Sequence, residues 1–237
     1  MKKNILILLF LVIIMISPII NAANLLEQGI NFYNQSKYQE AIEKLNSFAI
    51  NNPKNSSVYY YLGLSHLKIK EYSLALNSLK LAKDINPDNY KIILNLSRAY
   101  YHLVKYEKAK SHLEKLNIKT DEQIYNLLGL IYMQKDSFQK AEENFKIAMN
   151  LNNSNYYVLN NLSYLYIKNG DYKSAKKYLI KAVNLEPEVA FIYNNLGIVY
   201  ENLNEYDLAL EYYKKALEIN VDYIKAKNNL KRLKGEK

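Results

Sequence analysis

Histidine is rare and cysteine absent in this chain of 237 residues, and the other side chains that often carry catalysis are not arranged for it. The histidines His66, His102 and His112 form no His-x-x-x-His pair or other spacing typical of zinc sites. Glu142 and Glu143 would point about 100° apart on a helix, whereas two acids that flank one bond must face each other. No serine lies in a nucleophile-elbow sequence, and the absence of cysteine removes thiol catalysis. We therefore expect no enzyme, with no catalytic, metal-binding or cofactor-binding residues and no cofactor.

Nucleotide and nucleic-acid binding also find little support. Four of the six glycines recur at one position of a repeat, while Gly170 falls in a turn and Gly235 in the tail. None is left for a phosphate-binding loop. The 24 tyrosines invite a base-stacking or sugar-stacking interpretation. Most of them, however, recur at positions expected to pack helix against helix, so we expect no nucleic-acid partner.

The elements that must position any functional residue are copies of one unit. Six anchor alanines recur at spacings of 34, 34, 32, 34 and 34 residues: Ala41, Ala75, Ala109, Ala141, Ala175 and Ala209. Twelve residues before each stands a small residue, namely Gly29, Gly63, Ser97, Gly129, Ser163 or Gly197. Three residues before each stands an aromatic residue, namely Tyr38, Tyr72, Tyr106, Phe138, Tyr172 or Tyr206.

Each unit predicts a helical hairpin. The apolar residues follow a helical period in two segments of about a dozen residues, which a polar turn such as residues 168–171 separates. Gly63 and Ala75 would lie where two helices approach closely, since a larger side chain would overpack that contact. The second helix must stop at a proline twelve residues after the anchor, as at Pro53, Pro87 and Pro187.

This pattern resembles the tetratricopeptide repeat, whose period is about 34 residues. The resemblance implies an all-α, right-handed superhelical solenoid of six helical hairpins plus a C-terminal capping helix from Ile224 to Lys234. Gln28 replaces the usual leucine in the first repeat, and the third repeat is two residues short and lacks the proline. No linker or second domain is evident. The expected boundaries are 1–22 for a signal peptide or uncleaved anchor, 23–223 for the array (repeats 23–55, 56–89, 90–121, 122–155, 156–189 and 190–223), and 224–237 for the capping helix and tail.

In this family the first helix of each repeat lines the concave surface. Asn95, Asn161 and Asn195 lie fourteen residues before an anchor, and they resemble the asparagine ladder by which some members hold extended peptides. A carboxamide suits that task because it both donates and accepts hydrogen bonds. The candidate peptide-binding residues are Asn95, Arg98, Asn126, Tyr157, Asn160, Asn161, Tyr164, Lys168, Asn194, Asn195 and Asn202. The alternative is family background, since asparagine is common at this position and Glu27, Tyr61 and Leu127 interrupt the series.

The N-terminus indicates export. Lys2 and Lys3 precede an apolar run from Ile5 to Ile16, and Ala22-Ala23 follow, in the order of a secretory signal peptide. An uncleaved anchor is the alternative, although Ile5 to Ile20 would span about 24 Å as a helix against roughly 30 Å of hydrocarbon. Either way the lysines favour the cytoplasmic side. We expect the repeats to lie outside the cytoplasm, either periplasmic or extracellular, or anchored to the membrane and facing outward.

The net charge is only mildly basic. Lys and Arg number 32 against 23 Asp and Glu, a formal net charge of +9. The dense run from Lys225 to Lys237 would be either a solvated face of the capping helix or a contact for an acidic partner or anionic lipid. The sequence as a whole predicts an adaptor that binds a protein or peptide on its concave face. The alternatives are a self-assembling or complex-assembly subunit and an accessory subunit of a cell-envelope enzyme.

Overall fold

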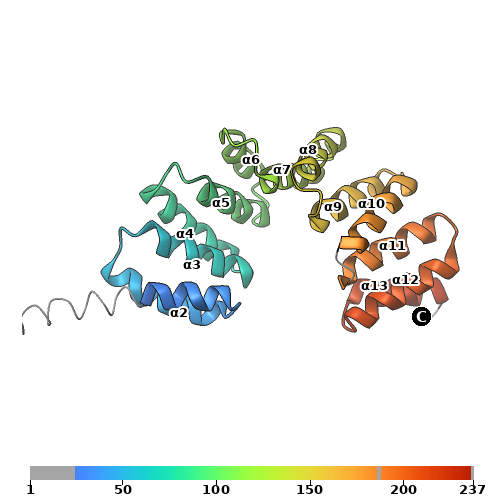
Figure 1. Cartoon of the computed structure of the whole chain (residues 1–237), viewed down its shortest axis with the longest axis horizontal. Helices are drawn as coiled ribbons and strands as arrows, with labels where there is room; N and C mark the ends of the chain where they lie inside the picture. Colours follow the sequence, from blue (N-terminus) through green and yellow to red (C-terminus); the bar gives the residue numbers. More distant parts are fainter. Residues whose placement is uncertain (1–24, 186–187, 236–237) are drawn as a thin grey trace, which may run out of the picture. The chain divides into compact units, whose positions relative to one another are not determined.

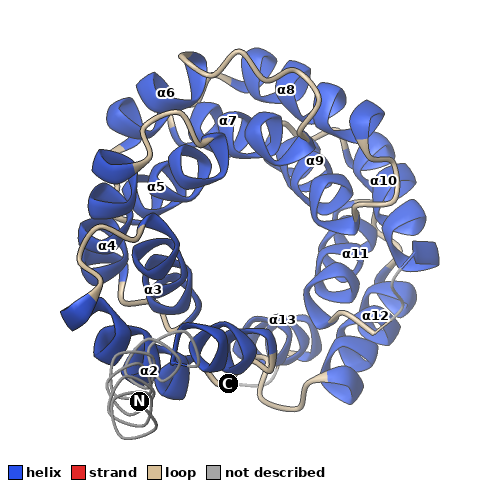
Figure 2. Cartoon of the chain, turned by 60° about the vertical axis from the view of Figure 1, so that its left-hand side comes forward, coloured by secondary structure: helices blue, strands red, loops and turns tan. Residues whose placement is uncertain are grey.

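The computed structural model describes residues 25–185 and 188–235, and within them every regular element is a helix (Figure 2). The expected signal segment and Pro187 lie outside the described residues. First helices of the repeats are residues 25–34, α3 (Ser56–Lys68), α5 (Tyr90–His102), α7 (Glu122–Gln134), α9 (Tyr156–Lys168) and α11 (Ala190–Asn202). Second helices are α2 (Tyr38–Asn51), α4 (Tyr72–Ile85), α6 (Tyr106–Glu114), α8 (Phe138–Leu151), α10 (Tyr172–Leu185) and α12 (Tyr206–Ile219). The predicted all-α fold of helical hairpins is confirmed, and α13 (Ile224–Lys234) follows the last hairpin.

The protein forms two compact units, which the sequence did not lead us to expect. Unit 1 ends at Asn117 and contains residues 25–34 and α2 to α6, and unit 2 begins at Ile118 and contains α7 to α13 (Figure 1). The division falls in the shortened third repeat, where α6 has 9 residues against 14 in α4. Residues 115–121 form no helix. The second helix of this repeat is thus five residues shorter than α4, although the repeat lacks only two residues, and a non-helical connection lies at the division.

Within each unit, every helix packs against the next in the sequence, and first helices also contact the first helices of neighbouring repeats. Side chains define where most first helices begin. Asn55, Asn89, Asp121 and Asn155 each accept hydrogen bonds from backbone N–H groups of the first turn that follows. Such caps satisfy donors that have no partner inside the helix. Among the described helices, none is both long enough and apolar enough to cross a bilayer.

A left-handed residue forms the turn of every hairpin. It stands two residues before the recurrent aromatic, which is the first residue of each second helix. Only Gly170 among these turn residues is glycine, with φ of 75°; the others are Ser36, Lys70, Val104, Asp136 and Asn204. Since a side chain in this conformation costs roughly 1–2 kcal/mol, the surrounding hairpin contacts must impose it.

The anchor alanines lie at the centre of the packing, and all six are fully buried. The small residue of the first helix faces the residue sixteen positions later. A Cβ atom added to Gly63 would lie 2.5 Å from Cγ of Leu79. Where serine takes this position, its hydroxyl donates to its own helix, as Ser163 does to the Leu159 carbonyl at 2.7 Å. The expected close approach of the two helices is confirmed, and the glycine meets a side chain of the second helix there.

Candidate binding surface on the first helices

Asparagine side chains join neighbouring first helices in unit 2. Nδ2 of Asn161 donates to Oδ1 of Asn126 at 2.9 Å, from α9 to α7. Asn195 on α11 donates to Asn160 on α9 at 2.8 Å in the same way. Asn229 on α13 continues the series with a bond of 3.0 Å to Asn194. Each bond spans 35 residues, so the asparagines tie repeats together in addition to anything they offer a ligand.

A carboxamide in such a pair retains hydrogen-bonding capacity. Each side chain has two N–H donors and two acceptor lone pairs, and one inter-repeat bond uses one donor of Asn161 and one lone pair of Asn126. Asn126, Asn160, Asn161 and Asn195 are all half-buried, so part of each remains accessible. These four residues can therefore both link helices and contact a peptide backbone.

Two other asparagines of the candidate set are buried. Asn194 is 2% exposed, accepts from Asn229 and donates to Asn195 at 3.4 Å. Asn95 is 5% exposed, and its Nδ2 donates to the Lys91 carbonyl at 2.8 Å and the Tyr60 hydroxyl at 3.3 Å. Asn202 is exposed at the end of α11, where it donates to the carbonyl of Ile198. The sequence pattern does not distinguish Asn95, Asn194 and Asn202 from the other candidate asparagines. In the structure the first two are buried, and Asn202 is bonded to its own helix.

Two accessible aromatic residues lie on one face of α9. Tyr157, Asn161, Tyr164 and Lys168 are spaced by three or four residues, which places them on the same side of a helix. Tyr157 is 53% exposed and Tyr164 42%. The Lys168 ammonium lies 5.9 Å from the centre of the Tyr164 ring, within reach of a cation–π contact. This face thus presents both aromatic and polar groups to solvent.

The structure adds aromatic partners that the sequence analysis missed. Tyr156 stacks on Tyr157 with ring centres 4.3 Å apart, and Phe191 of α11 lies 5.9 Å from Tyr157. These rings line a hollow of about 540 Å³, together with residues before α11 and α13 that include Tyr223. The sequence contains a signal for this aromatic cluster: the adjacent residues Tyr156 and Tyr157 lie outside the recurrent core positions, and Phe191 follows 35 residues after Tyr156.

Arg98 does not join this set, because it lies on α5 in unit 1. Its Nη1 donates to Oδ1 of Asn95 at 2.8 Å, and both residues line a pocket with Lys68 and His102. The eleven candidate residues thus fall on two surfaces, with Asn95 and Arg98 in unit 1 and the other nine in unit 2.

The perturbed acids have structural partners. Glu142 accepts from the Tyr166 hydroxyl at 2.6 Å and pairs with Lys146 at 2.7 Å, and these bonds, Lys146 first, lower the pKa of its carboxyl. Burial, followed by the bond to Glu142, raises the pKa of the Tyr166 phenol. The Tyr166–Glu142 bond joins the first helix α9 to the second helix α8, whereas the Glu142–Lys146 pair lies within α8. Within the described ranges, no group of three His, Asp or Glu side chains is placed to hold a metal.

The histidines likewise serve in packing. His66 is buried in the position that tyrosine takes in later repeats, and its Nδ1 lies 2.7 Å from Oε2 of Glu71. His102 stacks on Tyr72 and His112 on Tyr100. Burial, with weaker effects of neighbouring cations, lowers the pKa of both His102 and His112.

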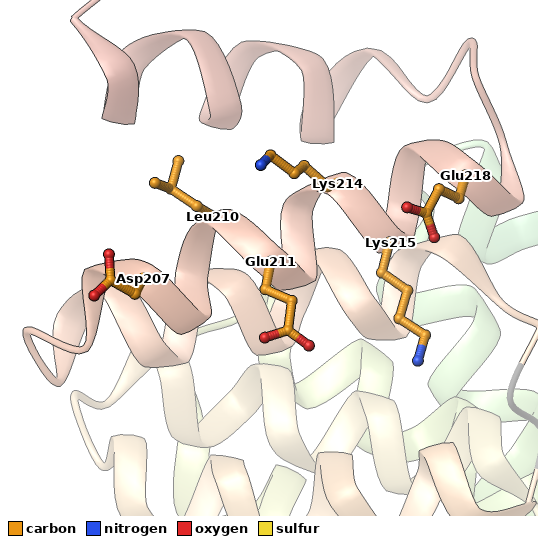
Figure 3. Close-up of a pocket in the computed structure, with 6 residues that line it drawn as sticks. All are labelled: Asp207, Leu210, Glu211, Lys214, Lys215 and Glu218. Carbon is orange, nitrogen blue, oxygen red and sulfur yellow. The ribbon is translucent and has the colours of Figure 1, made fainter.

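A further hollow, on the second-helix side, has no convergent chemistry. It is lined only by residues of α12: Asp207, Leu210, Glu211, Lys214, Lys215 and Glu218. Figure 3 shows that Glu211 and Lys215 project to one side of the helix while Leu210 and Lys214 project to the other. The lining carries acidic and basic groups together, as on a solvated helix face.

Comparison with known sequences identifies the family. Tetratricopeptide repeat profiles match residues 26–90, 122–155, 156–189 and 190–223. The protein belongs to the tetratricopeptide repeat family, as its repeat pattern predicted.

Similar proteins include the Hsp70/Hsp90 co-chaperone CNS1 of Saccharomyces cerevisiae, 28% identical over 129 residues, which are 52% of this chain and 34% of the relative. The BBSome complex member BBS4 of Xenopus tropicalis is 32% identical over 111 residues, 46% of this chain and 22% of the relative. The matched segment therefore spans about a third or less of the length of these relatives.

Among solved structures, the APC/C hetero-tetramer Cut9-Hcn1 aligns with a TM-score of 0.81 and 22% identity over 90% of this chain and 42% of that chain. A tetratricopeptide repeat protein of Parabacteroides merdae aligns with a TM-score of 0.76 and 19% identity, over 90% of this chain and 84% of that one. At these identities the structural matches support the fold alone. Family and relatives together indicate a protein–protein interaction scaffold.

Proposed function

We propose that this protein is a non-enzymatic adaptor that acts outside the cytoplasm and binds a peptide or protein through the first-helix face of unit 2. The observation that carries the proposal is the face of α9, where Tyr157, Tyr164 and Lys168 are accessible beside half-buried asparagines. Tyrosine brings large contact area together with a polar tip, and it is enriched at protein interfaces.

The carboxamides on this face suit an extended backbone. Asn161 and Asn195 are held in place by their bonds to the preceding repeat. A group that is already fixed loses little entropy when a ligand binds. In this proposal they contact backbone amides of the partner, and the hollow beside Tyr157 and Phe191 takes an apolar side chain. The co-chaperone and complex-member roles in the names of the two relatives also imply protein partners.

Crosslinking in native cells tests the surface. Wild type should capture a partner that a Y164A/K168A variant captures several-fold less. The matched control is K177A/K181A, which removes exposed side chains from α10 on the second-helix side. An equal loss of partner capture in both variants, or no loss in either variant, would contradict the proposal. Light scattering separates a heterologous partner from self-assembly, because self-assembly predicts a mass that rises with protein concentration.

The proposed location rests on the order of residues 2–23, which resembles a signal peptide. Intact-mass measurement of protein from the native host tests it. A mature protein that begins near Ala23, recovered outside the cytoplasm, is the expected result. A cytoplasmic protein that retains Met1 would reject export, whereas a membrane fraction that retains residues 1–22 would indicate the anchor.

A further inference from the structure

Helix α13, the last described helix of unit 2, presents charge of only one sign to solvent (Figure 1). Its inner face packs on the core of unit 2 through Ala226, Leu230 and Leu233. Ile224, Lys227 and Lys231 follow a spacing of three and four residues on the outward face, and Lys225 lies beside them. All four are exposed, and no residue of α13 is acidic. We call Lys225, Lys227 and Lys231 the lysine face.

The lysine face is not neutralised by acids of the protein. Arg232 of the same helix is neutralised, because its Nη2 donates to Oε2 of Glu201 at 2.7 Å. Among the described residues, none of the three lysines of the lysine face forms an ion pair. Asp222, in the turn before α13, is the nearest acid in the sequence and can offset one of the three charges.

The helix dipole does not account for these charges. Cations are favourable near the C-terminal end of a helix, whereas anions are favourable near its N-terminal end. Lys225 and Lys227 lie in the first turn of α13, after an N-cap residue, Tyr223, whose side chain makes no capping bond. Lys227 and Lys231 are like charges four residues apart, which repel each other. The lysine face is therefore unfavourable for the stability of α13 itself.

A capping role explains the polarity of α13 but not its single sign of charge. The last element of a repeat array needs a polar outer face to keep the array soluble. Residues of mixed charge meet that need, as Asp207, Glu211, Lys214 and Glu218 do on the exposed side of α12. Acidic residues also favour solubility more than lysine does. A helix with lysines and no acid therefore favours an anionic binding partner.

The composition of this face suits a membrane better than a protein. Lysine is depleted at protein–protein interfaces, where aromatic residues are enriched, and the described residues of α13 include no aromatic residue. Two aliphatic side chains lie exposed at the start of the helix instead: Ile224 is 69% exposed and Val221, in the preceding turn, 68%. At a bilayer, ammonium groups meet headgroup phosphates while apolar side chains enter the interface.

We propose that the lysine face binds the surface of an anionic phospholipid bilayer, with its three ammonium groups at the headgroup phosphates and with Ile224 and Val221 in the interface. The inference goes beyond the proposed adaptor function and does not depend on the binding face of α9. A lysine near an anionic surface contributes about fivefold to affinity, so three lysines contribute about a hundredfold. Such binding is reversible and weakens as salt screens the charges.

An introduced tryptophan provides a direct test, because the chain contains none. Full-length protein with Ile224→Trp is mixed with phosphatidylcholine vesicles that contain either about 30% phosphatidylglycerol or none. With the anionic vesicles, the indole emission should shift to shorter wavelength, and about 0.5 M NaCl should reverse the shift. An apolar N-terminus retained in the protein would bind both kinds of vesicle and resist salt, so the salt-reversible shift isolates the lysine face.

A second reporter position tests the orientation of the protein on the vesicle. Ile180 is 40% exposed on α10, on the second-helix side of unit 2. Emission from Ile180→Trp should stay unchanged with both kinds of vesicle when salt is varied. The comparison distinguishes contact through α13 from general adsorption of a basic protein.

Charge-removing variants separate the lysine face from the net charge. In the Ile224→Trp background, K225Q/K227Q/K231Q should weaken binding to anionic vesicles about a hundredfold. The matched control is K173Q/K177Q/K181Q, which removes the same charge from three exposed positions of α10 and should weaken binding less than about threefold. Circular dichroism should be unchanged in both variants, because exposed side chains contribute little to stability.

Three results would overturn the inference: no salt-reversible shift at position 224 with anionic vesicles, an equal shift at position 180, or equal loss of binding in the two triple variants. Poly-glutamate serves as the probe for an acidic protein. A shift with poly-glutamate and none with anionic vesicles would also overturn the inference, in favour of an acidic protein partner. The test uses no variant of α9, so failure here leaves the adaptor proposal intact, and failure of the crosslinking test leaves the membrane surface intact.

Discussion

Gly197 and Tyr213 form a size-matched pair, and a single methyl group on the glycine should disrupt it. A Cβ atom at Gly197 would lie 2.5 Å from Cδ1 of the Tyr213 ring and closer still to Cε1. Carbon atoms in contact prefer about 3.5–4.0 Å. The ring is fully buried, and its hydroxyl donates to Oε2 of Glu201 at 2.8 Å. It cannot move aside without losing that bond.

The expected cost follows from two opposing effects. Overpacking a core costs about 1–3 kcal/mol, and the fixed ring places this site at the upper end. Replacing glycine by alanine inside a helix returns about 0.5–1 kcal/mol. Gly197→Ala should therefore destabilise unit 2 by about 2 kcal/mol. Gly63→Ala should cost less than about 1 kcal/mol, because Leu79 can rotate and the repeats with Ser97 and Ser163 already accept a Cβ atom opposite leucine.

Urea unfolding followed by circular dichroism measures both changes, and hydrogen exchange of α11 and α12 localises the first. The double variant G197A/Y213L provides the decisive control. Replacing the ring by the leucine of other repeats should remove the clash, so the two changes should couple by at least about 1 kcal/mol. Additive losses, or equal costs at Gly197 and Gly63, would refute the size-matching explanation.

Three further predictions concern the turn, the capping helix and the asparagine bonds. Gly170→Ala should destabilise by about 1 kcal/mol in urea titration although its methyl group meets no atom within 4 Å, because φ of 75° disfavours a side chain; an unchanged midpoint would contradict this. Arg232 lowers the pKa of Glu201, so this pair stabilises above the ordinary pKa of the carboxyl and is lost as pH falls. Wild type should accordingly lose more thermal stability between pH 7 and about pH 3 than Glu201→Gln, and parallel losses would count against the pair. Asn161→Ala should cost about 0.5–1.5 kcal/mol by removing an inter-repeat bond, whereas Asn202→Ala at an exposed position should have little effect; the reverse order in the same titration would reject this assignment.

Much of the fold could be predicted because the same packing pattern recurs in six repeats of the sequence. Ala175, for example, has an equivalent alanine in each of the other five repeats, and all six alanines are fully buried. The aromatic three residues earlier likewise begins every second helix. A residue type that recurs at the same position of every repeat indicates a packing requirement there, whereas a residue type found in one repeat alone does not.

The division into two units lacked such support, because it depends on one irregular repeat. Repeat three is two residues short, and its second helix α6 has only 9 residues. The spacing of 32 residues between Ala109 and Ala141 shows that two residues are missing. The length of α6 that results depends on its contacts with neighbouring helices, which the spacing does not give. Periodicity therefore indicated the position of the irregularity without its consequence.

The helix face that carries the candidate residues could be predicted, but the burial of each residue and its bonds to neighbouring helices could not. Helical spacing placed Tyr157, Asn161, Tyr164 and Lys168 on one face of a first helix, as the structure has them. Spacing did not separate buried Asn194 from half-buried Asn195, because adjacent residues differ by only about 100° of rotation. The inter-repeat bonds depend on neighbouring helices as well, which one repeat does not specify.

Site-specific photocrosslinking tests the central claim most directly. A benzophenone amino acid replaces Tyr164 on α9, at a position 42% exposed, or Lys181 on the second-helix side of α10, which is also exposed. After irradiation of native cells, the Tyr164 position should yield a discrete adduct with another protein, and the Lys181 position should yield none. Adducts from Lys181 alone would show that the first-helix face of unit 2 is not the binding surface.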